Sequence, residues 1–218
     1  MAFVKKDLLV HKVYLDLKKM ISEGELEPGE KLYQERIAEK LGVSRTPLVK
    51  AFQILEQEMF IESIPRRGMY VRSVNAFDMI NAFECWQGIE TTAVRIVTAK
   101  LTDGQLRELK KFFDPFLNSK DIDRLAYLKA DSEFHHRLIQ MTRNDFLIKM
   151  NDIAHVFNQT YRTGLIREPH YTLPEHLMIL SAMDTRDICL AEEYMRNHIR
   201  KSIQTIKANI SKYSENIN

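Results

Sequence analysis

The sequence predicts a mainly α-helical protein in two parts: short helices with a small β-hairpin, and then an all-α antiparallel helical bundle. Two observations support this fold class. Before residue 75, turn residues flanked by apolar pairs are typical of a hairpin. After it, apolar residues at helical spacing fill most of the 218-residue chain. We place the boundary at the short segment 73–75, which gives domains 1–75 and 76–218.

Residues 34–50 predict two short helices joined by a tight turn, after a first amphipathic helix over residues 7–22. Gly42 allows the left-handed backbone that ends a helix. Ser44 or Thr46 can then cap the next helix. This arrangement is a helix-turn-helix, whose second helix enters a DNA major groove by its N-terminal residues.

Residues 58–74 predict a small hairpin, with a turn at Pro65-Arg66-Arg67-Gly68 between two apolar segments. Three helices followed by a basic hairpin make a winged helix-turn-helix. Arg66 and Arg67 at the tip would lie on DNA phosphates or in a minor groove. The alternative is an ordinary solvated turn.

The second domain reads as helical throughout. The expected helices cover roughly residues 76–100, 103–118, 121–142, 145–163, 173–183 and 185–212. Pro169 and Pro174 are among the helix breakers between them. A bundle of this kind can hold a site between facing helices.

The composition is that of a soluble globular protein, with 44% apolar and 28% charged residues. No apolar run approaches the ~20 residues that a membrane span needs. The N-terminus has no apolar signal region, and two cysteines give no disulfide framework. We therefore expect a cytoplasmic protein with no membrane partner.

The net charge of +2 does not by itself indicate nucleic acid. Local clustering is more informative, because five basic residues of the first domain can form one positive face. These are Arg36, Arg45, Lys50, Arg66 and Arg67.

Asp131 and His135 are four residues apart, so they project from one face of a helix. His176 opens a later helix and His198 lies on the last one. One carboxylate with imidazoles suits Zn²⁺, Ni²⁺ or Mn²⁺. Helical histidines are also commonly just solvated or hydrogen-bonded, so spacing alone leaves both interpretations open.

The N-terminal motifs resemble the GntR family of bacterial transcription regulators. They are Gly29-Glu30-Lys31-Leu32, Arg36-Ile37-Ala38, Gly42-Val43-Ser44-Arg45-Thr46-Pro47, Leu55-Glu56 and Pro65-Arg66-Arg67-Gly68, in family order. The resemblance implies a DNA-binding head in which Arg36, Arg45 and Gly68 match positions that touch DNA.

Residues 76–212 resemble the FCD effector domain of the FadR-type GntR subfamily. The matching segments are Asp131–His135, Glu175-His176 and Ala191–His198. Many members hold a metal with one Asp and three His, and Asp131, His135, His176 and His198 match these positions. The resemblance implies a divalent metal, zinc before nickel or manganese, with open coordination sites for a small carboxylate effector.

In the DNA-binding head, we expect Arg45 to make a bidentate bond to guanine. Arg36 is expected at a phosphate or at a base at the groove edge, Thr46 is expected at a phosphate, and Lys50 is a further candidate. Relatives usually carry Arg-Glu where Val49-Lys50 stand here, which puts the family's operator sequence in doubt.

An anionic effector needs a counter-charge in the bundle. Arg95, Arg137, Arg143 and Arg162 are candidates, although a helical arginine is more often a solvated surface residue. Trp86 aligns where relatives often carry an arginine. Its indole would replace an arginine that binds the effector's carboxylate with an apolar surface. The alternative is that Trp86 is an ordinary core residue.

The resulting hypothesis is a homodimeric, effector-responsive regulator, in this family most often a repressor, that binds a palindromic DNA operator. The effector would be a small organic acid. One rival is a metal-dependent hydrolase, since a bound metal can activate water. Against it, we find no supported general base, phosphate loop or nucleophile elbow. A third alternative is a regulator whose metal is purely structural.

Overall fold

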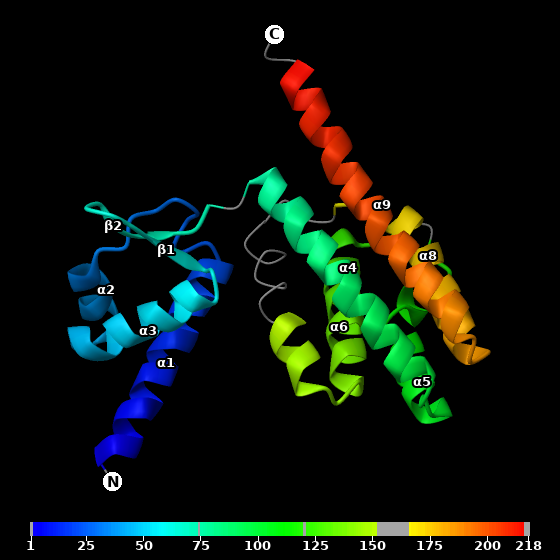
Figure 1. Ribbon diagram of the computed structural model, residues 1–218, viewed down its shortest axis with the longest axis horizontal. Helices are drawn as coiled ribbons and strands as arrows, with labels where there is room; N and C mark the ends of the chain where they lie inside the picture. Colours follow the sequence, from blue (N-terminus) through cyan, green and yellow to red (C-terminus); the bar gives the residue numbers. More distant parts are fainter. Residues whose placement is uncertain (1, 74, 120, 152–165, 216–218) are drawn as a thin grey trace. The chain divides into compact units, whose positions relative to one another are not determined.

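The computed structural model describes residues 2–73, 75–119, 121–151 and 166–215. It is mainly α-helical, with one antiparallel hairpin, which confirms the predicted fold class (Figure 1). The described chain forms two compact units, one up to Asn75 and one from Ala76 onward. None of the helices in these ranges combines the length and the apolarity that crossing a lipid bilayer requires.

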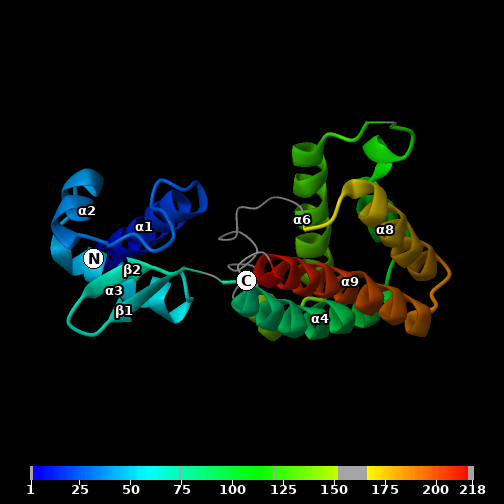
Figure 2. The same cartoon turned by 90° about the horizontal axis from the view of Figure 1, so that it is seen from above.

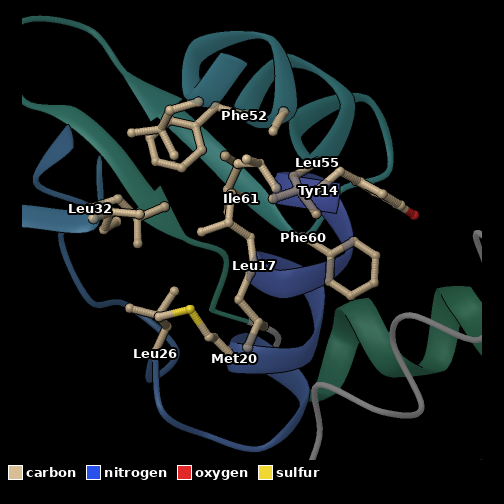
Figure 3. Close-up of a cluster of buried hydrophobic side chains, with 14 of the residues drawn as sticks. Tyr14, Leu17, Met20, Leu26, Leu32, Phe52, Leu55, Phe60 and Ile61 are labelled. Carbon is tan, nitrogen blue, oxygen red and sulfur yellow. The ribbon is translucent and has the colours of Figure 1, made fainter. Parts of the chain in front are cut away.

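The first unit contains the predicted three helices and hairpin in the predicted order. The elements are α1 (Ala2–Ser22), α2 (Gln34–Leu41), α3 (Arg45–Gln57), β1 (Ile61–Ile64) and β2 (Gly68–Val71). Leu17 of α1, Leu55 of α3 and Ile61 of β1 are fully buried against one another in a single core (Figure 3). Burial of this apolar surface fixes the recognition-helix candidate α3 against α1 and the hairpin.

The turn between α2 and α3 has the predicted left-handed glycine. Gly42 has φ 65° and ψ 34°, and its N–H points back to carbonyl oxygens of α2. A residue with a side chain would adopt this backbone at a cost, which is why glycine ends the helix here. Ser44 occupies the N-cap position of α3, but its side chain makes no capping hydrogen bond, so that part of the prediction is wrong.

The hairpin pairs Ile61 with Val71 and Ile64 with Gly68. The N–H of Arg67 donates to the Ile64 carbonyl over 3.0 Å and closes the turn. A bridge between Lys31 and Tyr70 adds the segment before α2 to the edge of β2. The wing and the segment just before α2 are therefore held together by backbone hydrogen bonds.

The second unit is a helical bundle. Its elements are α4 (Ala76–Thr98), α5 (Asp103–Lys110), the 3₁₀ helix η1 (Asp114–Phe116), α6 (Arg124–Met141), α8 (Pro169–Asp184) and α9 (Ile188–Glu215), with a further helix over the described residues 145–151. Helices α4 and α9 lie side by side and run antiparallel (Figures 1 and 2). Helix α8 packs on α9, and α6 packs on α4.

Several helix boundaries differ from the sequence-based expectation, most clearly around α5 and α8. The helix expected over 103–118 ends at Lys110 and continues only as η1. Pro169 was expected to break a helix but opens α8, because a first-turn N–H has no intrahelical partner to lose. Pro174 lies inside α8, where one missing hydrogen bond is tolerated. The end of the helix expected over 145–163 lies outside the described residues.

Candidate metal centre and nucleic-acid interface

The bundle brings together the four residues that the sequence singled out as metal ligands. Asp131 and His135 come from α6, His176 from α8 and His198 from α9. Each offers one ligand atom, and all four atoms lie within 4.8 Å of one another. The three histidines are buried and Asp131 is partly exposed. Three helices distant in sequence thus converge on one small polar space in the interior.

The spacing of the donor atoms fits a bound divalent cation. His135 Nε2 and His176 Nε2 are 3.4 Å apart, and Asp131 Oδ1 lies 3.3 Å from His176 Nε2. Two nitrogens each ~2.1 Å from one divalent ion lie ~3.0–3.4 Å apart, from right-angle to tetrahedral geometry, so the spacing suits an ion of four to six ligands. Without a proton or a cation between them, two facing lone pairs in a buried site repel each other. The set of one carboxylate and three imidazoles is also chemically suited to zinc, nickel or manganese.

The opposite ring nitrogen of each histidine also meets a polar group. His135 Nδ1 lies 3.1 Å from Glu90 Oε2, and His198 Nδ1 lies 2.9 Å from Glu175 Oε2. His176 Nδ1 lies 3.1 Å from the hydroxyl of Tyr127. Partners at this second nitrogen fix the direction and the tautomer of a metal-binding imidazole.

Glu175 is the centre of a charged cluster beside His198. Arg167 donates to both of its carboxylate oxygens over 2.7 Å, and Lys201 donates to one of them over 2.8 Å. Burial would raise the pKa of Glu175, but hydrogen bonds from Arg167, His198 and Lys201 lower it well below its usual range. Glu175 therefore stays ionised and can accept a proton-bearing Nδ1.

The environment keeps His176 neutral. Burial, followed by the nearby His198 and His135, lowers the pKa of His176 well below its usual value. Burial raises the pKa of Tyr127, so its hydroxyl keeps its proton. A neutral imidazole is the form that binds a metal ion.

The proposed DNA-reading residues lie on the surface of the first unit. Arg45 is the first residue of α3 and Arg36 lies in the first turn of α2; Thr46, Lys50, Arg66, Arg67 and Gly68 are also exposed. Arg45 Nη2 is 2.9 Å from Glu35 Oε1, and the Arg36 guanidinium lies 5.0 Å from the ring centre of Tyr33. The starts of α2 and α3 thus present basic side chains to solvent.

Comparison with known proteins identifies both units. The sequence pattern described as "Bacterial regulatory proteins, gntR family" matches residues 9–71, and the pattern of the FCD domain matches residues 81–201. This chain belongs to the GntR family and carries an FCD domain. It is a transcriptional regulator, and a DNA-binding function follows from its family.

Individual relatives of this GntR protein are also named as regulators. The Nta operon transcriptional regulator of Aminobacter aminovorans is 33% identical over 122 residues, which cover 56% of this chain and 58% of that protein. The HTH-type transcriptional repressor RspR of Escherichia coli (strain K12) is 25% identical over 89% of this chain and 87% of its own length. The solved structure of E. coli McbR/YncC shares the fold, with a TM-score of 0.73 at 20% identity over 93% of this chain and 98% of that one.

The family and its named members are transcriptional regulators, so the rival interpretation of this GntR protein as a hydrolase is not supported. The four-residue cluster is therefore to be understood as part of a regulatory domain.

Of the candidate effector-binding residues of this GntR protein, one lies beside the four-residue cluster and two are engaged in ion pairs. Trp86 is buried in the core with its ring centre 4.8 Å from that of His135, and its Nε1 donates to Asn151 Oδ1 over 3.3 Å. Arg95 pairs with Glu192 at the surface, and Arg137 pairs with Glu108 through two hydrogen bonds. Both guanidinium groups are therefore already paired with a carboxylate and do not offer a free positive charge to an anionic effector. Arg162 lies outside the described residues.

Sequence reasoning missed four polar residues around the cluster: Glu90, Tyr127, Arg167 and Glu175 as a partner of His198. Glu175 was noted only as the neighbour of His176. A signal was available for Glu90, because it interrupts the apolar face of α4 between Ile89 and Ala93, which are both buried. Arg167 precedes α8 and had no periodicity to mark it.

Proposed function

We propose that this GntR regulator binds a palindromic operator as a homodimer, and that a metal-bound small organic acid changes its operator affinity. Residues 1–75 form the DNA-binding domain and residues 76–218 form the effector-binding and dimerisation domain. A two-fold symmetric protein presents its recognition helix twice, which a palindrome matches. Arg45 contacts a base, and the other exposed basic residues contact phosphates.

The convergence of Asp131, His135, His176 and His198 within 4.8 Å is the observation that supports this proposal most directly. A divalent metal held there would act as a Lewis acid that binds a carboxylate oxygen of the effector. Zinc fits the nitrogen-rich ligand set, and nickel and manganese fit it as well. Four protein ligands leave further positions of a five- or six-coordinate ion free for the effector.

The surroundings of the cluster favour a small acid with an apolar part. Trp86 lies against His135, so one wall beside the cluster is aromatic. Arg167 and Lys201 add positive charge on the His198 side, although both are engaged by Glu175. An acid that binds one conformation of the protein more tightly than another shifts the population toward the first, and this shift changes the operator affinity. The name of the relative RspR favours repression as the sense of regulation.

The test uses the full-length protein and DNA from upstream of its own gene. Elemental analysis of the purified protein should find about one divalent metal ion per chain. Asp131→Ala and His198→Ala should lose this metal, whereas the control His136→Ala should keep it, because His136 is exposed on the other side of α6. Size-exclusion chromatography with light scattering gives the oligomeric state.

Fluorescence anisotropy then measures operator affinity with and without metal, across a series of mono- and dicarboxylic acids. At least one acid should change the affinity of the metal-loaded protein by fivefold or more, in line with the ~1–3 kcal/mol of ordinary allosteric coupling. A protein that binds metal while no acid alters its DNA affinity would show that the metal is structural. A monomer with equal affinity for the operator and for random duplex would overturn the proposal as a whole.

A further inference from the structure

Three polar residues around the cluster share one feature, since each contacts the Nδ1 atom of a different histidine. Glu90 of α4 meets His135 at 3.1 Å. The other two contacts are Tyr127 of α6 with His176 at 3.1 Å and Glu175 of α8 with His198 at 2.9 Å. The three contacts come from different helices and use both carboxylates and a phenol.

A neutral imidazole carries one proton and one lone pair on opposite nitrogens. The group that accepts a hydrogen bond at Nδ1 holds the proton there, and the lone pair is then on Nε2. In this bundle the Nε2 atoms of His135 and His176 are the ones that face each other, 3.4 Å apart. The arrangement of the Nδ1 partners therefore matches the direction in which a metal ion needs the lone pairs.

We propose that Glu90, Tyr127 and Glu175 are positioning residues of the metal centre, which keep each imidazole proton on Nδ1 and present the Nε2 lone pairs to one ion. This inference rests on the proposed metal binding and extends it to residues that touch no metal. It gives α4, which supplies none of the four ligands, a direct polar contact with the centre through Glu90.

Glu90 makes the strongest case. Its side chain has no exposure to solvent, and its Oε2 lies 3.1 Å from His135 Nδ1 as an ion-pair contact. Neither of its carboxylate oxygens has a hydrogen-bond partner among the described residues. A buried carboxylate is unfavourable unless a positive charge or hydrogen bonds compensate it. A metal ion bound at His135 would supply the compensating positive charge through the imidazole. This accounts for a carboxylate in the core of the helical bundle.

Tyr127 works by a different means. Thr172 Oγ1 lies 2.9 Å from its hydroxyl, and Phe113 and Phe116 pack against its ring. The phenol is thus held in place, and at 3.1 Å its oxygen can accept a proton-bearing Nδ1 of His176. A carboxylate partner both orients an imidazole and raises its basicity, whereas a phenol mainly orients it. Loss of Glu90 should therefore weaken metal binding more than loss of the Tyr127 hydroxyl.

The experiment compares the full-length wild type with Glu90→Gln and Tyr127→Phe, each first stripped of metal. Zn²⁺ affinity is measured by competition with a chromophoric chelator, and Co²⁺ loading gives a visible spectrum that reports the ligand geometry. Two matched controls change the same groups elsewhere. Glu108→Gln removes a surface carboxylate that pairs with Arg137, and Tyr14→Phe removes a hydroxyl that donates to Glu58 in the first unit.

We expect Glu90→Gln to lower Zn²⁺ affinity by ~10–100-fold and Tyr127→Phe by about tenfold, in the range found when such partners are lost. The Co²⁺ bands should shift in both variants and stay unchanged in both controls. Circular dichroism and melting of the metal-free proteins check folding, and Tyr127→Phe, which removes a single oxygen, carries the test if Glu90→Gln does not fold.

Two failures are distinguishable. If the wild type itself binds no Zn²⁺, or Asp131→Ala binds it equally well, the proposed metal centre is wrong. If the wild type binds Zn²⁺ and Asp131→Ala does not, but Glu90→Gln and Tyr127→Phe keep wild-type affinity and Co²⁺ spectra, the metal centre stands and the positioning role is overturned.

Discussion

The guanidinium of Arg45 and the carboxylate of Glu35 lie 2.9 Å apart and join the start of α3 to the first turn of α2. Both side chains are largely exposed, at 67% and 65%. Such a pair adds little to stability. We expect its effect on DNA binding to be larger, because it orients the arginine proposed to read a base and places a negative charge where phosphates would approach.

Glu35→Gln should strengthen binding to random duplex and reduce the preference for the operator. The carboxylate repels phosphates whatever the base sequence, and it also directs Arg45. By contrast, Arg45→Ala should cost ~1–3 kcal/mol on the operator and relax specificity at one base pair per half-site. Anisotropy titrations on operator and scrambled duplex at several salt concentrations measure both effects. Glu56→Gln makes the same charge change in the last turn of α3 and should alter neither the affinity for random duplex nor the preference for the operator. An equal effect of Glu56→Gln would show that Glu35 has no specific role in DNA binding.

Arg66 at the wing tip has a φ of 64°, a backbone conformation that residues with a side chain adopt at a cost of ~1–2 kcal/mol. Arg66→Gly should therefore raise the free energy of unfolding by ~0.5–1 kcal/mol while weakening DNA binding. Arg67→Gly removes the same charge from a residue without a positive φ, and should lower stability. Urea denaturation measures the free energy of unfolding of both variants against the wild type. Equal destabilisation of the two would show that Arg66 is not strained.

The features that sequence predicted well are those set by neighbours along the chain. Gly42 ends α2 because of its own backbone freedom, and the helices follow from apolar periodicity. Asp131 and His135 share a face by helical spacing alone. His176 and His198 were candidates by residue type, but only the family resemblance favoured their joining this face, since no local rule brings α8 and α9 to α6.

The features that sequence did not predict depend on packing between distant elements. Glu90 looks like an ordinary helical glutamate until α6 buries it against His135. The effector arginines were chosen for their place on helices, yet Arg95 and Arg137 found acidic partners at the surface. Arg167, in the segment before α8, reaches the cluster instead through Glu175. Long side chains and long-range ion pairs leave no periodic signal.

Removal of metal should destabilise the second unit. A ligand that binds only the folded state adds stability that grows with its concentration, about 2.7 kcal/mol at 100 times its Kd. Treatment with a chelator should therefore lower the melting temperature of the full-length protein, and one equivalent of Zn²⁺ should restore it. Asp131→Ala should melt at the same temperature with and without Zn²⁺. Restoration of Asp131→Ala by Zn²⁺ would place the stabilising ion at another site.

Trp86 is the one tryptophan of the chain, and its ring centre lies 4.8 Å from that of His135. Its fluorescence should therefore report on the metal centre directly. An open-shell ion such as Ni²⁺ quenches a nearby excited indole, whereas Zn²⁺, with a filled d shell, does not. Titration of metal-free protein with Ni²⁺ should quench most of the emission at one equivalent, and Zn²⁺ added first should prevent it.

His135→Ala, which keeps Trp86 but removes a ligand, should shift quenching to higher Ni²⁺ concentration, and His136→Ala should behave as wild type. Ni²⁺ bound at one equivalent by mass spectrometry without loss of emission would mean that the ion lies away from His135. The same emission should then follow effector binding without any added label, because the proposed acid would enter beside His135 and meet the indole.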